Sequence, residues 1–312
     1  MTGILLQPPP PASASYIGRF APSPSGPLHF GSLVTALASY LDAKAHQGRW
    51  LVRMEDLDPP REQPGAADSI LRSLDTHGLH WDGEVLYQSQ RVDVYQAQLD
   101  TLIQAGLAYP CNCSRQRLQN LGGSYDGHCR LHPPASHTAI AWRLKLYDLP
   151  YGFALPETIG FTDVIQGVQA QGLRIAAGDQ ILKRRDGFYA YQLAVVVDDI
   201  AQGITHIIRG ADLLAVTGRQ IAFFLLLGQP APTFGHLPLA LQPNGQKLSK
   251  QNQAPALVDT QAAQNLWQAL HFLGQNPPVD LRTSHCEELL SWAVAHWQRT
   301  AIHGLGHCHK PE

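Results

Sequence analysis

Residues 19–32 read Arg-Phe-Ala-Pro-Ser-Pro-Ser-Gly-Pro-Leu-His-Phe-Gly-Ser and separate a short apolar run from an amphipathic segment. The run around Ile17 and Phe20 is typical of a β-strand, the three prolines interrupt regular structure, and a helical period begins at Gly31. A loop that ends at a helix N-terminus presents backbone N–H groups and the positive end of the helix dipole, which favours a phosphate. The stretch therefore predicts a strand, a rigid loop and a helix, with a phosphate site beside His29.

A second strand is expected soon after this helix. Residues 49–56 are strand-like, and residues 57–60 form a turn sequence. A strand, a helix and a strand in close succession imply a right-handed parallel crossover, and ligands of parallel sheets bind beyond the carboxyl ends of the strands. Residues 19–25 and the pair Glu55-Asp56 both fall at such ends, so we expect them around one crevice.

The rest of the chain alternates between helical and strand-like periods, which predicts an α/β protein. Residues 109–132 are the exception, because they are rich in Cys and Gly and show little periodicity. Helices are expected at residues 66–77, 92–104, 213–227, 262–273 and 286–297, and strands around residues 139–146, 158–168 and 204–209.

Composition places the chain among ordinary globular proteins. Its 312 residues, 44% of them hydrophobic, suffice for a large core in two lobes or in one domain with insertions. The formal net charge of −2 argues against a protein that is basic throughout, although residues 183–185 form a local basic patch for nucleic acid. Since there is neither a long apolar run nor an export signal, we expect a cytoplasmic protein whose five cysteines serve metal or structural roles.

A second charged motif lies far downstream, where residues 247–251 read Lys-Leu-Ser-Lys-Gln. Together with residues 19–32 it resembles the two ATP-binding signatures of class I aminoacyl-tRNA synthetases, and the flanking sequence resembles the glutamyl branch of that family. The resemblance covers residues 16–254. It implies a ligase with a Rossmann-type parallel sheet that uses ATP with Mg²⁺ to convert L-glutamate into glutamyl-adenylate.

The amino-acid pocket is expected from charge matching, because glutamate offers one ammonium group and two carboxylates. Glu55 suits the ammonium group, while Arg19 and Arg209 suit the carboxylates. If Arg19 is buried against the γ-carboxylate, glutamine leaves it unpaired, so we expect a strong preference for glutamate. The alternatives are surface ion pairs for these charged residues and a core aromatic for Tyr191. The resemblance implies that the glutamate-binding positions are Arg19, Ala21, Ser23, Glu55, Tyr191 and Arg209.

ATP is expected at the other end of the same loop, because adenylate formation spreads charge over phosphate oxygens and the leaving pyrophosphate. His29 and Lys250 are the candidate catalytic residues, with a solvated surface loop as the alternative for the lysine motif. Ser32 stands where the family most often has His, and Leu248 and Gln251 replace Met and Ser. Ser32 carries no positive charge, so weaker ATP turnover is expected. The resemblance implies ATP contacts at His29, Gly31, Ser32, Lys247, Ser249 and Lys250.

Residues 109–132 lack the periodic apolar side chains of a core, so their fold needs another source of stability. Three thiols, those of Cys111, Cys113 and Cys129, fall within this segment. Their spacing favours a tetrahedral Zn²⁺ site, whose binding free energy replaces the missing core. The alternative is a set of inert buried thiols.

The fourth zinc ligand is open on chemical grounds. His128 and His132 are the usual kind of ligand for zinc, whereas the resemblance implies Tyr125 at this position. We follow the resemblance, because the spacing from Cys113 to Tyr125 and on to Cys129 matches it. One structural zinc ion held by three thiolates and a tyrosine is therefore expected.

Two further polar groups invite a metal interpretation that we do not adopt. Neighbours such as Asp198 and Asp199 point to different faces of a helix or strand, so we expect one of them to cap a turn or to pair with a backbone N–H. Near the C-terminus, Cys286 is expected on a helix facing the core, and the last ten residues are expected to form a frayed tail.

These expectations divide the chain into five parts. They are a disordered segment at residues 1–15, the first half of a Rossmann catalytic domain at 16–108, a zinc-binding insertion at 109–132, the remainder of that domain at 133–254, and a helical region at 255–312. The last part is too short for a separate anticodon-binding domain, so we expect none.

The Cys-rich insertion and residues 189–199 resemble most closely the truncated members of the glutamyl branch. That resemblance implies activation of glutamate without tRNA and its transfer to the queuosine base at the wobble position of tRNA(Asp), by an enzyme that we expect to be monomeric. The alternatives are a conventional glutamyl-tRNA synthetase acting on the acceptor end, a non-catalytic synthetase-like RNA-binding protein, and a nucleotidyltransferase that shares the first motif.

Overall fold

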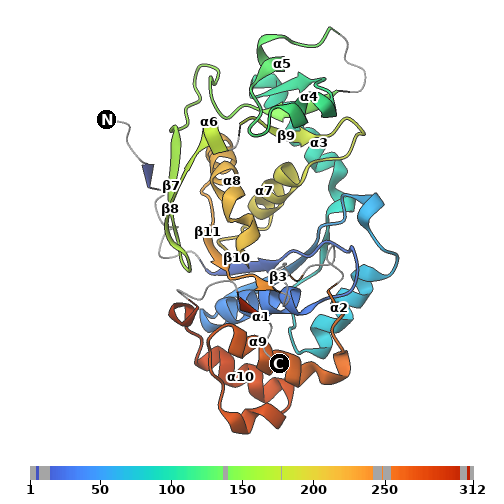
Figure 1. Cartoon of the computed structure of the whole chain (residues 1–312), viewed down its shortest axis with the longest axis vertical. Coiled ribbons are helices and arrows are strands. Elements are labelled where there is room, and N and C mark those ends of the chain that lie inside the picture. The colour runs from blue at the N-terminus through green and yellow to red at the C-terminus, as the bar shows by residue number, and fades with distance from the viewer. Residues whose placement is uncertain are drawn as a thin grey trace.

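The computed structural model describes residues 5–6, 15–135, 140–176, 178–241, 248, 254–302 and 308–309; at residues 5–6, 175–176 and 308–309 it describes the backbone alone. Figure 1 shows a lobe with α4 (Arg115–Asn120) and α5 (His128–Leu131) at one end of the long axis. Helices α9 (Ala262–Phe272) and α10 (Cys286–Ala295) lie at the other end, and a parallel sheet lies between.

The central sheet consists of β2 (Ile17–Phe20), β3 (Arg49–Met54), β4 (Leu86–Tyr87), β10 (His206–Gly210) and β11 (Thr233–Leu237). All neighbouring strands are parallel, in the order β11-β10-β2-β3-β4. Strand β2 leads through the proline-rich loop into α1 (Phe30–Ala45) and back to β3, its neighbour in the sheet. The expected parallel crossover is thus confirmed.

Helix α1 begins at Phe30 because the preceding loop supplies its cap. The backbone of His29 is extended, and its Nδ1 accepts a hydrogen bond from the Ser32 N–H at 3.2 Å. Leu33, Leu37 and Leu41 recur every four residues and are fully buried. Because α1 contacts β2 and β3 as well as α9 and α10, it fixes the loop against the sheet.

The other expected helices are also present. Helices α2 (Ala66–Thr76) and α3 (Val92–Gln104) follow β3 and β4, and the apolar run after residue 189 forms α7 (Tyr191–Ala201). Helix α8 (Leu214–Leu226) packs against α7, and both contribute to a second apolar core that also includes Leu99 of α3.

An antiparallel hairpin precedes α7. It is formed by β7 (Thr158–Asp163) and β8 (Gly167–Gly172), and the short α6 (Leu173–Ala176) follows. Strand β1 (Leu5–Leu6) pairs in parallel with β7. Part of the segment expected to be disordered is therefore a strand, because the edge of β7 offers it backbone partners; residues 1–4 and 7–14 lie outside the described residues.

The small lobe is built on an antiparallel sheet of β5 (Ala108–Cys111), β6 (Ala141–Leu144) and β9 (Gln180–Lys183). Its own buried cluster consists of Tyr109, Cys111, Cys113, Tyr125 and Cys129. Three of these five residues are the cysteines of the insertion, so this lobe has few apolar side chains of its own.

The C-terminal helices share their core with the first half of the sheet. Leu266, Leu270 and Leu289 belong to the same buried cluster as the leucines of α1. Buried Asp42 of α1 accepts hydrogen bonds from Trp297 Nε1 at 2.9 Å and from Arg299 Nε at 2.6 Å, which anchors the segment after α10.

Cys286 begins α10 and is half-buried against this core. Of the last ten residues, which we expected to be frayed, Cys308–His309 form β13 and pair with β12 (Ala240–Leu241). The other eight lie outside the described residues.

In the described part of the chain no helix combines the length and the apolar character needed to cross a membrane.

Candidate active site

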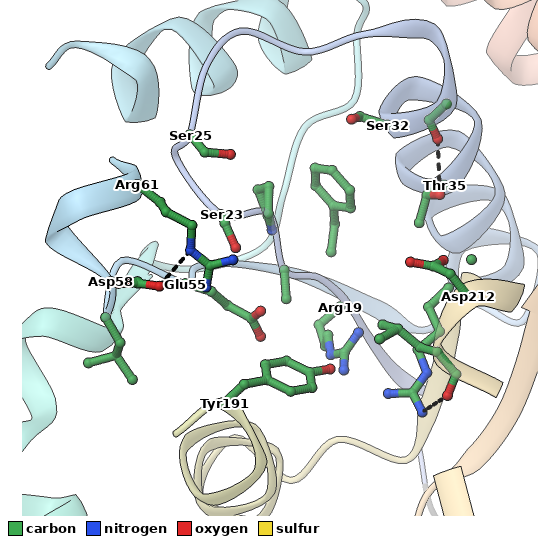
Figure 2. Close-up of a pocket in the computed structure, with 18 of the residues that line it drawn as sticks. Arg19, Ser23, Ser25, Ser32, Thr35, Glu55, Asp58, Arg61, Tyr191 and Asp212 are labelled. Atoms are coloured by element: carbon green, nitrogen blue, oxygen red, sulfur yellow. Dashed lines mark hydrogen bonds and ion pairs between the residues drawn. The ribbon is translucent and has the colours of Figure 1, made fainter. Parts of the chain in front are cut away.

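A cavity of about 1100 Å³ opens at the carboxyl ends of β2, β3 and β10. Figure 2 shows side chains from these strand ends, from α1 and from α7 arranged around it. All six residues expected to bind glutamate line the cavity, and so do His29, Gly31 and Ser32 of the ATP set. Leu248 lines it too, whereas the flanking motif residues 247 and 249–251 lie outside the described residues.

The charged residues of the glutamate set are buried rather than placed on the surface. Arg19 and Arg209 are 4% and 3% exposed, and the side chain of Glu55 is 11% exposed. Tyr191 begins α7, packs against the second core with its ring and points its hydroxyl toward Arg19 (Figure 2). The alternative that the charged residues form weak ion pairs on the surface is therefore excluded.

Asp199 joins two buried arginines beneath the cavity. Its carboxylate lies 3.3 Å from Arg19 Nε and 2.6 Å from Arg53 Nη2. Arg19 therefore has a protein partner whichever amino acid is bound. The expected preference for glutamate, which rests on an otherwise unpaired Arg19, does not follow from this residue alone.

The neighbouring Asp198 points the other way, toward α3. It accepts hydrogen bonds from Gln88 Nε2 at 2.7 Å, Arg91 Nε at 2.7 Å and Tyr95 OH at 2.8 Å. The expectation that the two aspartates point to different faces is correct. The expected turn cap or backbone pairing is wrong, because at full burial each carboxylate has charged or polar side chains as partners.

Glu55 is the carboxylate of the expected glutamate set, and it lines the cavity. Burial raises the pKa of Glu55 to about 7, although Arg53 and Arg19 lower it and Asp199 raises it further. The nearest charged contact is Arg53 Nη2, 4.0 Å from Glu55 Oε1. At 4.0 Å, Arg53 is too far from Glu55 for a hydrogen bond. A ligand ammonium group placed here would give Glu55 a positive partner at hydrogen-bond distance.

Arg209 lines the cavity and has one donor without a partner in the part of the chain that the structure describes. Its Nε donates to His236 Nε2 at 3.0 Å, and its Nη2 donates to Thr217 Oγ1 at 2.8 Å. Among the described residues no partner accepts from its buried Nη1. Because an unsatisfied buried donor is costly, this atom is a natural position for a ligand carboxylate.

The ATP end of the cavity is closely packed. Ser32 Oγ lies 3.0 Å from His29 Nε2, so the hydroxyl and the imidazole act as one polar pair. The backbone of the second motif approaches the first here, since a Cβ on Gly31 would lie 3.2 Å from Leu248 O. The two motifs are thus brought together at this residue.

The three cysteines of the small lobe come together as expected. Their sulfur atoms lie within 4.8 Å of one another. Tyr125 OH lies 3.6 Å from Cys111 Sγ and 3.4 Å from Cys113 Sγ. His128 and His132 are exposed, and their rings contact each other in a tilted arrangement. The buried cluster of three thiols and one phenol fits a tetrahedral metal site.

Several buried residues that support the cavity-lining arginines were not anticipated. They are the buried Arg53 of β3, Asp163 at the end of β7, and Thr217 and His236 near Arg209. A signal was present for two of them, since Arg53 and His236 each lie between apolar residues near the end of a strand. A polar residue at such a position must find a buried partner.

A family model described as tRNA synthetases class I (E and Q), catalytic domain, matches residues 17–146 and 153–271. The fold, the cavity and this match define a ligase of the aminoacyl-tRNA synthetase type. The chain belongs to this class I family. Membership implies that ATP with Mg²⁺, an amino acid and tRNA are its substrates.

Curated relatives narrow the identification further. The proteins named glutamyl-Q tRNA(Asp) synthetase from Vibrio cholerae serotype O1, Serratia proteamaculans and Escherichia coli K12 are 51%, 55% and 53% identical to this chain. The matches cover 91%, 91% and 92% of this chain and 91%, 90% and 90% of those relatives. The resemblance read from the sequence is therefore confirmed, and the activity is like that of a glutamate–tRNA ligase.

A solved structure shows the same fold. The crystal structure of a glutamate tRNA ligase from Elizabethkingia meningosepticum, in complex with its amino acid, superposes with a TM-score of 0.78 at 24% identity. The superposition covers 96% of this chain and 67% of that longer chain.

Proposed function

We propose that the protein converts L-glutamate and ATP into glutamyl-adenylate without tRNA, and then transfers the glutamyl group to the queuosine base at the wobble position of tRNA(Asp). The observation that carries this proposal is the shared cavity, which is lined by the six residues of the glutamate set and by three of the ATP set. Both sets belong to the protein alone, so the proposal needs no RNA group to complete the activation site.

The charges around the cavity support glutamate as the amino acid. At the most buried end of the cavity, Arg19, Arg53 and Arg209 bring three positive charges, and Glu55 and Asp199 bring two negative charges when both are ionised. The less buried charged residues that line the rest of the cavity add two positive and three negative charges; they are Asp58, Arg61, Glu62, Arg184 and Asp212. Glutamate carries one ammonium group and two carboxylates, so it complements the buried end, where Glu55 suits the ammonium group and the arginines suit the carboxylates.

The chemistry divides between the two ends of the cavity. An oxygen of the glutamate α-carboxylate attacks the α-phosphorus of ATP, and the bond to pyrophosphate breaks. In this proposal His29, the N-terminus of α1 and Lys250 stabilise the charge that develops on the phosphates. A hydroxyl of the acceptor then attacks the carbonyl carbon, and AMP leaves with the bonding electron pair.

The acceptor rests on the relatives, which carry the name glutamyl-Q tRNA(Asp) synthetase at 51–55% identity. The test is ATP–pyrophosphate exchange with glutamate in the absence of tRNA, followed by transfer of labelled glutamate to tRNA(Asp) with and without queuosine. We expect exchange without RNA and transfer to the modified tRNA alone, with Lys250→Ala losing both. Equal charging of both tRNA preparations would instead favour acceptor-end chemistry, and exchange that requires tRNA would refute independent activation.

We propose that the contact between Gly31 and the second motif matters for ATP. Replacing Gly31 with Ala would place a Cβ 3.2 Å from Leu248 O and 3.3 Å from the His29 ring, so one of them must move. We expect the KM for ATP in the exchange assay to rise on the order of tenfold, because small displacements at a reacting centre are costly. The matched control is Gly172→Ala, where a Cβ meets nothing within 4 Å and no change is expected. An unchanged KM in Gly31→Ala would show that the contact is irrelevant to ATP.

We propose a structural zinc ion held by Cys111, Cys113, Tyr125 and Cys129. Arg143 Nε lies 3.2 Å from Cys111 Sγ, a contact that suits a thiolate ligand. When bound, the ion would replace the apolar core that this lobe lacks.

The fourth ligand is tested by metal analysis of two variants. We expect Tyr125→Phe to weaken zinc affinity by at least about tenfold, the scale of effects around zinc ligands. His128→Ala should retain full zinc content, because His128 is exposed. Full zinc content in Tyr125→Phe with loss in His128→Ala would reverse the assignment.

A further inference from the structure

Arg209 is held by a neighbouring strand as well as by a helix. Arg209 of β10 and His236 of β11 are direct partners in the parallel register, and Arg209 Nε donates to His236 Nε2 at 3.0 Å. Thr217 of α8 accepts from Nη2 at 2.8 Å. These contacts leave Nη1 as the buried donor without a partner among the described residues, in a side chain that lines the cavity.

His236 is itself fixed by Asp163. The His236 Nδ1 lies 2.5 Å from Asp163 Oδ2, and the His236 backbone N–H donates to Asp163 Oδ1 at 3.1 Å. Asp163 Oδ1 also accepts from the backbone N–H groups of Ile165 at 3.0 Å and Gln166 at 2.8 Å. Asp163 is 1% exposed and His236 is fully buried, so neither residue can replace the other with a water molecule from bulk solvent.

The hydrogen-bond directions follow from this arrangement. An ionised carboxylate accepts only, so Asp163 accepts the hydrogen bond of Nδ1–H, and the lone pair of Nε2 accepts from the Arg209 N–H. Thr217 Oγ1, 3.1 Å from the same Nε2, donates to Leu213 O at 3.0 Å. Burial and the nearby Arg209 lower the pKa of His236, while Asp163 and Asp212 raise it, and the net direction is downward. A neutral imidazole is the form that can accept from Arg209.

We infer that Asp163 and His236 are positioning residues for glutamate binding, which hold the Arg209 guanidinium so that its Nη1 meets a substrate carboxylate. This inference rests on the proposed function, because it takes Arg209 as a glutamate ligand. Neither residue is among those that line the cavity, so both act through Arg209.

A purely structural role makes a different prediction. If the pair only satisfies buried polar atoms, any substitution that keeps a partner for Asp163 preserves the site. If His236 positions Arg209, the atom that matters is the acceptor at the Nε2 position. Asparagine places its amide near the Nδ1 position and glutamine reaches the Nε2 position, so the two substitutions separate these roles.

The experiment measures glutamate-dependent pyrophosphate exchange in His236→Asn and His236→Gln. We expect His236→Asn to raise the KM for glutamate about tenfold, equivalent to about 1.4 kcal/mol, while kcat and the KM for ATP change by less than about threefold. His236→Gln, which keeps an acceptor for Arg209 Nε, should lie within about threefold of wild type in every parameter.

The matched control is His77, another fully buried histidine with two polar partners outside the cavity. Its Nδ1 lies 2.6 Å from Ser73 O, and Asn265 Nδ2 lies 3.2 Å from its Nε2. His77→Asn and His77→Gln should not alter the KM for glutamate. Thermal unfolding of all four variants identifies any change that is only a loss of stability.

The outcomes separate this inference from the proposed function. An equal rise in KM in both His236 variants, or a greater rise in His236→Gln, overturns the positioning role while wild-type exchange still supports glutamate activation. A change confined to unfolding temperature also overturns it. No glutamate-dependent exchange in the wild type refutes the proposed function instead, and binding of glutamate measured by calorimetry in the same variants then tests the positioning of Arg209 directly.

Discussion

Replacement of Glu55 by Gln is expected to raise the KM for glutamate about a hundredfold, which corresponds to the loss of about 3 kcal/mol from a buried charged hydrogen bond. Glu55 is the cavity carboxylate proposed to receive the substrate ammonium group, and its side chain is 11% exposed. The measurement is the glutamate dependence of pyrophosphate exchange. The KM for ATP should stay close to that of the wild type.

The same residue predicts a pH dependence with a definite sign. Burial raises the pKa of Glu55 to about 7, so in the free enzyme the side chain loses its charge as the pH falls through that value. The wild-type KM for glutamate should therefore fall as the pH rises from about 6 to about 8, because ionised Glu55 binds the ammonium group. The Glu55→Gln variant should lose this dependence.

The control is Glu157→Gln, the same substitution at an exposed position, which should leave both the KM and its pH dependence unchanged. A Glu55→Gln variant whose KM still falls with pH would assign the titration to another group. A variant with wild-type KM would remove Glu55 from the glutamate site.

Replacement of Asp199 by Asn is expected to be the most destabilising of these changes. Asp199 is 2% exposed and neutralises Arg53, which is fully buried, as well as Arg19. Removing one partner of a buried ion pair leaves an uncompensated charge, at a cost of about 3–5 kcal/mol. The free energy of unfolding from denaturant titration measures this cost, and the KM for glutamate should rise as well because Arg19 loses its support.

The pH range of this stabilisation follows from the pKa of Asp199. Burial raises the pKa of Asp199, but Arg19 and Arg53 lower it by more, so this pKa lies below the ordinary value for aspartate. The carboxylate therefore stays ionised at a lower pH than in the unfolded chain. The stabilisation is therefore present above about pH 4, the pKa of an unfolded aspartate, and is lost as the pH falls below that value.

The matched control is Asp186→Asn, because Asp186 forms an ion pair with Arg184 on the surface. Its loss should cost less than about 1 kcal/mol. The double variant Arg53→Met with Asp199→Asn should be less destabilised than the sum of the two single variants, since the stranded charge is removed. Additive effects would argue that the two residues do not form an energetic unit.

The sequence alone predicted the parts of the protein that depend on local pattern and on chemistry. The run from Ile17 through residues 19–32 and on to residues 49–56 has the periods of a strand, a loop, a helix and a strand, and a parallel crossover places the carboxyl ends of its strands at one edge. The same reasoning brought Arg19 and Glu55 to one cavity. Cys111, Cys113 and Cys129 were grouped correctly because closely spaced thiols without a periodic core imply a shared site.

Only the tertiary structure decided which charges neutralise one another. Arg19 meets Asp199 at a separation of 180 in residue number, and Asp163 meets His236 at a separation of 73. No local period encodes such pairs, because their partners are brought together by the order of strands in the sheet and by the packing of α7 and the β7–β8 hairpin against it. For residues 19–32 the sequence determined the loop and its chemistry. Only the tertiary structure decided that Arg19 lines the cavity with Asp199 as its partner, whereas Arg209, which also lines it, has a buried donor, Nη1, with no partner among the described residues.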